Sequence, residues 1–344
     1  MKVKTITLGS TGITTVQNGF GALPIQRVPM DEAVEIIRNA YKGGMRFFDT
    51  ARAYSDSEEK LGNALEVFDR STYYIATKSM AQTPEKFWEQ LETSLKLLKT
   101  DYIDIFQFHC AGTCFKPGDG TDMYECMLEA KAQGKIRHIG ITAHKIGIAK
   151  ESIECGYYET LQFPFSYITS DKELELVQMC KEKNMGFIAM KGLAGGLITH
   201  SEATFAYMEQ FDNVLPIWGV QKQSELDEWL SYMDNAPVLN DELRAYIEKE
   251  KVELTGEFCR GCGYCMPCPA GIQINSCARM SLMLRRAPSA SWLTPEKQEM
   301  MKKIEGCLNC GKCKTKCPYE LNTPELLKKN YEDYKKVLAG DVTV

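Results

Sequence analysis

The stretch TYYIATKSMAQTPEKFWEQLETSLKLLKTDYIDIFQFH (residues 72–109) predicts a strand, a helix and a second strand in succession. Its first and last segments, TYYIAT and YIDIFQFH, are short apolar runs rich in aromatic and β-branched residues, as in buried parallel strands. The helix between them is predicted over 84–99, with Thr83 as the N-cap and Pro84 at the first helical position.

The same alternation of strands and helices extends from about residue 16 to about residue 235. The other strand candidates are VQNGFGA (16–22), MRFFDT (45–50), IRHIGIT (136–142), TLQFPF (160–165), GFIAM (186–190) and NVLPIWG (213–219). Eight strands, each followed by a helix, predict an α/β fold of the (β/α)8 TIM-barrel type. A doubly wound open sheet is the alternative, which is weakened because no G-x-G-x-x-G motif opens the first helix. Residues 1–15 predict a hairpin that turns at residues 9–12.

Eight cysteines form two tight clusters near the C-terminus, in CRGCGYCMPCP (259–269) and CLNCGKCKTKCP (307–318). Three thiolates spaced C-x2-C-x2-C bind one iron–sulfur cubane, and the following Cys-Pro ligates the other cubane in two-cluster ferredoxins. The spacing therefore predicts two [4Fe-4S] clusters. The ligands of one are Cys268, Cys307, Cys310 and Cys313, and those of the other are Cys259, Cys262, Cys265 and Cys317.

Two other uses of these cysteines are disfavoured. Zinc sites rarely have four cysteines in each run, and crowded cysteines without a secretory signal favour metal over disulfides. The first run is one residue shorter than the expected C-x2-C-x2-C-x3-C-P, so the nearby Cys277 is an alternative ligand or a buried apolar residue.

The chain around the cysteines predicts a mainly helical ferredoxin-type module. Helical stretches run from about residue 240 to 253 and from 272 to 286, and Thr294-Pro295 opens another. We therefore expect two domains, a barrel over residues 1–240 and a helical extension with the 4Fe-4S module over residues 241–344.

Composition and charge exclude several classes of protein. The chain is 44% hydrophobic and 25% charged, which is ordinary for a globular protein. It has neither a signal-peptide pattern nor an apolar run long enough to span a membrane, so we expect a cytoplasmic protein without membrane contact. From residue 255 onward 14 Lys and Arg face 9 Asp and Glu, an excess that negatively charged clusters would offset. No aromatic-interleaved basic surface accompanies it, so we expect no nucleic-acid partner.

Four polar residues are predicted at the carboxyl ends of successive barrel strands, where the chemistry of such barrels takes place. Asp49, Lys78 and His109 each end an apolar run, and Tyr54 follows in a loop. Reducing a carbonyl by hydride requires a proton donor, and a lysine beside the Tyr54 phenol lowers its pKa. Asp49 can keep Lys78 charged, while His109 can donate a hydrogen bond to the carbonyl oxygen.

The D-T-A-x-x-Y motif with a strand-end Lys and a strand-end His resembles the catalytic tetrad of aldo/keto reductases. With the cysteine-rich tail, the chain is similar over its full length to the subgroup that has a C-terminal 4Fe-4S domain. The resemblance implies a nicotinamide cofactor, NAD(H) or NADP(H), and a small carbonyl or alcohol substrate. It also implies the residues that line the nicotinamide: Thr142, Gln162, Ser166, Met190, Lys191 and Gly192.

The segment GVQKQSELDEW (219–229) departs from the family pattern near the adenosine end of the cofactor. By resemblance, Lys222 lies in this site, while Glu225 stands near the position of an Arg that binds the 2′-phosphate. A glutamate repels a phosphate and accepts hydrogen bonds from a free ribose hydroxyl. We therefore expect a preference for NADH, with weak dinucleotide binding as the alternative.

Nicotinamides transfer two electrons as hydride, whereas a [4Fe-4S] cluster transfers one. A flavin would couple the two, but the sequence has no clear flavin motif. The first hypothesis is a carbonyl/alcohol oxidoreductase with Tyr54 as general acid and base, whose clusters transfer electrons or serve structure. The second is an electron-transfer protein whose barrel is a docking module, with a ferredoxin- or flavodoxin-like partner.

Overall fold

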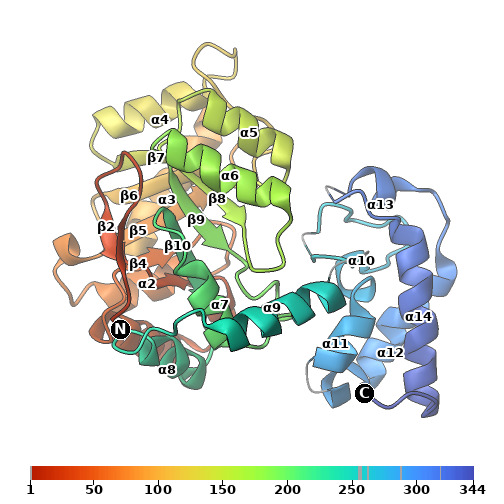
Figure 1. Ribbon diagram of the computed structural model, residues 1–344. Helices are drawn as coiled ribbons and strands as arrows, with labels where there is room; N and C mark the ends of the chain where they lie inside the picture. Colours follow the sequence, from red (N-terminus) through yellow and green to blue (C-terminus); the bar gives the residue numbers. More distant parts are fainter. Residues whose placement is uncertain (1, 255–257, 262, 287–288, 318) are drawn as a thin grey trace. The chain divides into compact units, whose positions relative to one another are not determined.

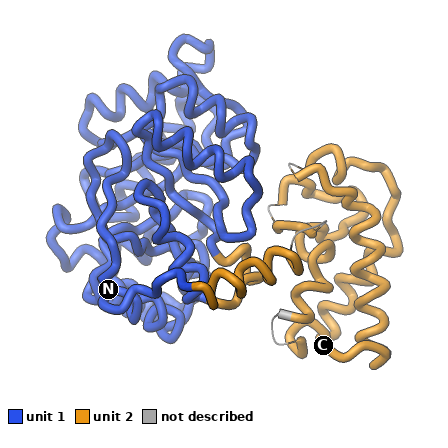
Figure 2. The backbone as a smooth tube through the Cα atoms, viewed as in Figure 1, with its two compact units in different colours: residues 1–192, 201–240 blue, residues 193–200, 241–344 orange. Residues whose placement is uncertain are grey.

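The computed structural model describes residues 2–254, 258–261, 263–286, 289–317 and 319–344. The chain forms two compact units (Figure 2). The first comprises Met1–Gly192 and Ser201–Asn240, and the second comprises Leu193–His200 and Asp241–Val344. The short segment Leu193–His200, within the part of the chain predicted as barrel, is thus grouped with the C-terminal region.

The first unit is a closed barrel of parallel strands in the order β10-β3-β4-β5-β6-β7-β8-β9 (Figure 1). Each predicted strand segment contains or overlaps one of these strands, so the TIM-barrel prediction is confirmed and the open-sheet alternative is wrong. The strands are β3 (Gly19–Gly21), β4 (Phe47–Asp49), β5 (Tyr74–Ser79), β6 (Ile103–Phe108), β7 (Ile136–Thr142), β8 (Thr160–Pro164), β9 (Gly186–Met190) and β10 (Val214–Gly219).

Helices alternate with the strands, as Figure 1 shows. They are α1 (Met30–Lys42), α2 (Ser57–Leu65), α3 (Pro84–Leu98), α4 (Met123–Ala132), α5 (Ile146–Glu154), α6 (Asp171–Glu182), α7 (Ser201–Met208) and α8 (Gln223–Ser231). The start of α3 is as predicted, because the Thr83 hydroxyl accepts a hydrogen bond from the Lys86 N–H and Pro84 opens the helix. Its buried residues Phe87, Leu91, Leu95 and Leu98 recur at helical spacing and form its inner face.

An N-terminal hairpin of β1 (Thr5–Thr7) and β2 (Thr14–Val16) closes the amino end of the barrel. Its turn residue Gly9 pairs with Met185, which directly precedes β9, and Ile6 and Leu8 join a core cluster with the barrel residue Phe47. A Cβ on Gly9 would lie 2.4 Å from the Gly186 nitrogen, and its φ is +50°, so only glycine fits this turn. The hairpin leaves the carboxyl ends of the strands as the end where a site can form.

The described part of the second unit is helical, with α9 (Asp241–Leu254), α10 (Ile274–Cys277), α11 (Met280–Arg286), α12 (Pro295–Lys302), α13 (Lys312–Thr315) and α14 (Thr323–Ala339). The helix predicted over 272–286 is interrupted between α10 and α11. Buried Asn330 of α14 satisfies the exposed backbone there, because its amide donates to the Ala278 carbonyl and accepts from the Ser281 N–H.

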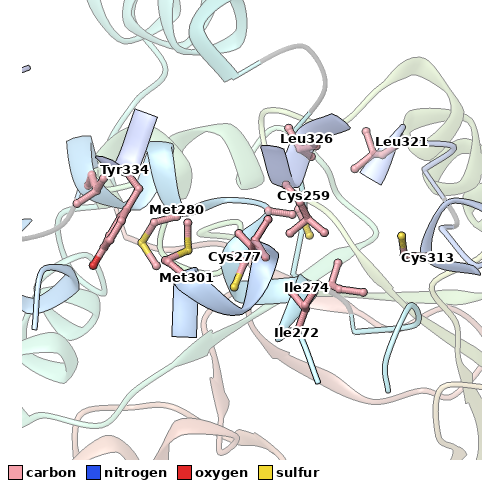
Figure 3. Close-up of a cluster of buried hydrophobic side chains, with 14 of the residues drawn as sticks. Cys259, Ile272, Ile274, Cys277, Met280, Met301, Cys313, Leu321, Leu326 and Tyr334 are labelled. Atoms are coloured by element: carbon pink, nitrogen blue, oxygen red, sulfur yellow. The ribbon is translucent and has the colours of Figure 1, made fainter. Parts of the chain in front are cut away.

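Figure 3 shows the core of this unit, in which Cys277 lies near Ile274, Met280 and Met301. Within the described residues, no helix combines the length and the apolar character needed to cross a bilayer.

Candidate functional site

The ends of β4, β5 and β6 bring Asp49, Lys78 and His109 to one end of the barrel. Asp49 is the last residue of β4, Lys78 lies one residue before the end of β5, and His109 directly follows β6. The backbone continues the strand pairing past these positions, since the Arg52 N–H donates to the Lys78 carbonyl and the His109 N–H donates to the Ser79 carbonyl. The sheet therefore fixes the three side chains on neighbouring strands.

Lys78 and Asp49 form a buried ion pair. The Lys78 Nζ lies 2.7 Å from Asp49 Oδ2 and 2.6 Å from the Thr50 carbonyl oxygen, and the two side chains are only 1% and 4% exposed. Burial works to lower the pKa of Lys78, but the negative charge of Asp49 and its hydrogen bond to Lys78 oppose this, and the pKa is raised overall. Lys78 therefore stays an ammonium ion at neutral pH.

Tyr54 lies against this ion pair and against His109. The Lys78 Nζ is 5.1 Å from the centre of the Tyr54 ring, and the Tyr54 and His109 rings meet edge to face at 5.6 Å. Burial raises the pKa of Tyr54 above its usual 10, and Lys78 opposes that rise without reversing it. The expected lowering by Lys78 is thus outweighed by desolvation, so Tyr54 is a protonated phenol at neutral pH.

His109 is an uncharged imidazole in this setting. Burial, assisted by the positive charge of Lys78, lowers its pKa to about 3. Its buried Nδ1 has no hydrogen-bond partner among the described residues. A neutral imidazole still has one N–H, so His109 can donate a hydrogen bond without carrying charge.

Sequence reasoning missed the pair that holds the loop of Tyr54. Arg52 contacts the fully buried carboxylate of Glu58 in α2, and its other Nη donates to the Ser55 carbonyl at 3.1 Å. Glu58 also accepts hydrogen bonds from the hydroxyls of Thr77 and Ser94, each at 2.7 Å. The hydrogen bond from Arg52 to Ser55 thus joins a residue before Tyr54 to the residue after it and holds this loop. Glu58 is adjacent to the exposed Glu59 in the sequence, and the pattern of SEEKLGNAL gave no signal that one of the two is buried.

Thr142, the last residue of β7, pairs with Gln162 in the middle of β8. The Thr142 hydroxyl accepts a hydrogen bond of 2.7 Å from the Cys110 N–H and so fixes the loop after His109. The Gln162 amide donates to Asp49 Oδ2 at 3.4 Å, while its buried Oε1 has no partner in the described part of the chain. Gln162 therefore offers an open acceptor next to the Lys78–Asp49 pair.

The other residues expected near the nicotinamide follow β8 and β9. Ser166 is buried, and its carbonyl accepts from the Thr169 N–H. Met190 ends β9 and pairs with Pro164, and Lys191 follows in a left-handed conformation with φ of +59°. A Cβ on Gly192 would lie 2.6 Å from the ring of Trp218, so a glycine is needed at this close approach.

Glu225 fills the start of α8. Its Oε2 accepts hydrogen bonds from the backbone N–H groups of Gln221, at 2.8 Å, and Lys222, at 3.2 Å. These N–H groups at a helix N-terminus would otherwise attract an anion. Trp229 of the same helix is stacked on Trp218 with ring centres 4.2 Å apart. A carboxylate therefore already occupies the position where a phosphate would be attracted.

A hollow in the second unit is lined by Cys268, Cys307, Cys310 and Cys313, the ligand set predicted for one cubane, and Cys265 also borders it. The rest of its wall includes the apolar side chains of Ile272, Ile274 and Leu327. None of the described cysteines forms a disulfide, and no three described His, Cys, Asp or Glu side chains are grouped closely enough for a single metal ion. Four cysteine side chains around one apolar-walled hollow fit a [4Fe-4S] cluster. The ligands of a cluster lie farther apart than those of a single metal ion, because each binds a different iron atom.

The second set of predicted ligands is described only in part, because Cys262 lies outside the described residues. Cys259 is buried, and its Sγ accepts a hydrogen bond of 3.3 Å from the Gly261 N–H. Cys317 is half-buried against the helical core. Cys277 is fully buried, its thiol faces the Met300 carbonyl, and burial raises its pKa to about 11. This environment favours a core thiol over a ligand at Cys277.

Comparisons with known proteins agree with both units. A model of the aldo/keto reductase family matches residues 6–215, and a model of the 4Fe-4S dicluster domain matches residues 258–322. L-galactose dehydrogenase of Arabidopsis thaliana is 32% identical over 218 residues, which are 58% of this chain and 68% of that protein. The NADH-specific methylglyoxal reductase of Escherichia coli is 27% identical over 229 residues, or 57% and 69% of the two chains.

Solved structures show the same fold. The holo form of aldo-keto reductase AKR11C1 from Bacillus halodurans superposes with a TM-score of 0.64 at 22% identity, covering 72% of this chain and 96% of that one. An aldo-keto reductase from Klebsiella pneumoniae in complex with NADPH gives a TM-score of 0.61 at 21% identity, with coverages of 72% and 95%. The chain belongs to the aldo/keto reductase family and carries a C-terminal 4Fe-4S dicluster domain.

Proposed function

We propose that this oxidoreductase interconverts a small carbonyl compound and its alcohol, with Tyr54 as the general acid and base. The observation that carries the proposal is the convergence of Tyr54, the buried Lys78–Asp49 pair and a neutral His109 at one end of the barrel. A bound nicotinamide supplies or accepts the hydride.

The proton chemistry follows from these side chains. In the reductive direction the protonated Tyr54 gives its proton to the alkoxide oxygen, and the ammonium of Lys78 stabilises the phenolate that remains. His109 donates a hydrogen bond to the carbonyl oxygen, which aligns the substrate and favours charge on that oxygen. In the oxidative direction Tyr54 accepts the proton of the alcohol.

The barrel end also suits a nicotinamide. Gln162 Oε1 is a buried acceptor open to a carboxamide N–H, beside Thr142 at the neighbouring strand end. Ser166, Met190, Lys191 and Gly192 follow the next strand ends and complete the proposed lining. A methionine at position 190 packs on a nicotinamide face without the ring stacking that an aromatic side chain gives.

We propose NADH as the preferred nucleotide. Glu225 accepts from the two backbone N–H groups that directly precede α8, and its negative charge at this helix start would repel a 2′-phosphate bound there. Lys222 adjoins it, and Arg27 contacts the Gln221 side chain, so two cations lie near this helix start.

The cysteine module is proposed to hold two [4Fe-4S] clusters in the interleaved ligand sets. The exposed Cys310 and Leu308 lie next to the exposed Lys312, Lys314 and Lys316 in sequence, which suits an acidic ferredoxin- or flavodoxin-like partner. This exposed edge favours the second candidate function, electron transfer with the barrel as a docking module. Coupling of one-electron and hydride chemistry would need a converter such as a flavin, for which the chain offers no motif.

An anaerobic titration of cluster-loaded protein with NADH and then NADPH tests the proposal. Probe substrates are aldehydes, 2-oxoaldehydes such as methylglyoxal, and sugars such as L-galactose, the last two suggested by the names of the relatives. We expect NADH to bind, carbonyl-dependent NADH oxidation, and unchanged iron–sulfur absorption. Failure of both nucleotides to bind would refute the hydride reaction and leave the electron-transfer function.

A further inference from the structure

Arg279, in the break between α10 and α11, is a half-buried cation without a carboxylate partner in the described part of the chain. Its Nη2 donates a hydrogen bond of 2.6 Å to the Gly195 carbonyl and contacts the Met283 sulfur at 3.2 Å. A guanidinium withdrawn from water usually pairs with an anion, because desolvation penalises the charge. Burial accordingly lowers the pKa of Arg279, and the nearby Cys259 opposes this lowering.

Two glycines make room for this guanidinium. A Cβ on Gly261 would lie 2.6 Å from Arg279 Nη1, and a Cβ on Gly195 would lie 3.0 Å from the same atom. Both glycines have positive φ, +70° and +68°, so any other residue would strain the backbone as well as displace the side chain. Gly261 in turn donates its N–H to Cys259 Sγ, so the guanidinium, the glycine and the thiol form one group.

We propose that Arg279 is a positioning residue that raises the reduction potential of the cluster bound through Cys259. The inference rests on the proposed cluster ligation. An all-cysteine [4Fe-4S] centre is anionic and becomes more so when it accepts an electron, and net charge and hydrogen bonding are among the determinants of its potential. A fixed cation beside one ligand therefore stabilises the reduced form more than the oxidised form.

The hydrogen bond from Arg279 to the Gly195 carbonyl is part of the proposed effect. A free arginine side chain loses considerable rotamer entropy when it is fixed, and it would otherwise extend its charge into water. The hydrogen bond to the Gly195 carbonyl holds the guanidinium against the Gly261 loop. The other cluster has the ligands that line the hollow around Cys268. The described lining of that hollow contains no arginine, and its one cation is the exposed Lys312. The two clusters should therefore differ in their response to changes at Arg279.

The test is a redox titration of intact, cluster-loaded protein, followed by electron paramagnetic resonance and visible absorption. Arg279→Gln removes the charge but keeps an amide donor, and Arg279→Lys keeps the charge and is the matched control. We expect Arg279→Gln to make reduction of one cluster about tenfold less favourable, ~59 mV more negative for a one-electron couple. The other cluster should be unaffected, and Arg279→Lys should stay closer to the wild type.

Gly195→Ala is a second variant, in case Arg279→Gln does not retain its clusters. Its Cβ would displace the guanidinium without altering any cysteine or the Gly261 loop, so a smaller negative shift of the same cluster is expected. Unchanged potentials in the variants that keep both clusters, or equal shifts of both clusters, would overturn the role of Arg279. Wild-type protein with iron and sulfide for fewer than two clusters would instead refute the proposed ligation, and this inference with it.

Discussion

The barrel end and the cysteine module hold their reactive groups in opposite ways. Lys78 and Asp49 touch each other across neighbouring strands at 2.7 Å and are almost fully buried, so the protein itself completes this site. The cysteines around the hollow range from the buried Cys313 to the exposed Cys310 and are not grouped as a single-ion site. We infer that a bound [4Fe-4S] cluster completes their arrangement.

This difference has a consequence for stability. The barrel is supported by a closed hydrogen-bonded sheet and a plugged amino end, neither of which depends on a cofactor. The core of the second unit includes cysteine side chains among its buried residues, such as Cys259 and Cys313. Where ligand binding is coupled to folding, the free energy of binding becomes part of the free energy of folding.

Removal of the clusters should therefore destabilise the cysteine module and leave the stability of the barrel unchanged. We expect anaerobic chelation of the iron to abolish the cooperative unfolding of the second unit and to expose amides of α14 (Thr323–Ala339) to hydrogen exchange. Amides of β6 and β7 should keep their protection. Equal loss of protection in both units, measured by mass spectrometry on the same sample, would contradict this separation.

Tyr54→Phe should produce the largest effect on catalysis. Loss of the general acid should lower kcat by about 10²- to 10⁴-fold. Nucleotide affinity and cluster spectra should not change, because the ring and its edge-to-face contact with His109 remain. Tyr157→Phe is the matched control, since Tyr157 is exposed. Carbonyl reduction at the wild-type rate in Tyr54→Phe would remove Tyr54 from the mechanism.

Arg52→Ala should affect both stability and turnover. Among the residues that the structure describes, the change leaves the fully buried Glu58 carboxylate with the hydroxyl donors of Thr77 and Ser94 alone. Isolating a buried charge typically costs about 3 kcal/mol of unfolding free energy, and the freed loop should also lower kcat. Arg52→Lys should recover part of the stability. Urea unfolding measures the first effect, and an unchanged midpoint in Arg52→Ala would show that Glu58 does not need the guanidinium.

The sequence was sufficient for the barrel and for the convergence of the four polar residues because both depend on local patterns. Runs such as IRHIGIT predict buried strands, and parallel strands in a barrel bring their carboxyl ends together. The cysteine spacing likewise predicted that Cys268 joins the cysteines of the distant second run. These four residues line one hollow, which Cys265 of the other predicted set also borders, so the division into two ligand sets stays a prediction. The roles of the individual residues remain proposals.

The parts that could not be predicted depend on contacts between distant residues. Glu58 and Glu59 are neighbours of the same type, and only the packing of α2 against α3 buries the first. The break in the helix over 272–286 is stabilised by Asn330, about fifty positions along the chain. The direction of the pKa shift of Tyr54 depends on whether burial or the charge of Lys78 has the larger effect. A sequence motif does not show how deeply a side chain is buried.

Glu225→Gln tests the nucleotide preference with a smaller effect. Glutamine keeps a carbonyl oxygen to accept from the N–H groups of Gln221 and Lys222, so the start of α8 should remain intact. Only the negative charge is lost. We expect kcat/KM for NADPH relative to NADH to rise by up to about fivefold, the range of an exposed charge interaction. Glu66→Gln, at a remote surface position paired with Lys99, is the control. An unchanged ratio would place the nucleotide elsewhere.

The pH profile should show the smallest change, because neither proton group of the barrel end titrates near neutrality. The pKa of His109 is lowered to about 3, so the imidazole remains uncharged above about pH 5. Burial raises the pKa of Tyr54 above 10, and reduction needs the protonated phenol. Activity should therefore be lost only as the pH rises through that raised pKa, and kcat for reduction should be nearly constant from about pH 5 to 9.

The measurement is kcat at saturating NADH across that range. His109→Gln has no imidazole to titrate and is the matched control for the acid limb. A decline of wild-type activity below about pH 6.5 that disappears in His109→Gln would show that His109 gains charge during turnover. Water would then reach His109 more readily than the burial of its side chain indicates. The barrel end and the cysteine module would in that case differ less in their exposure to water.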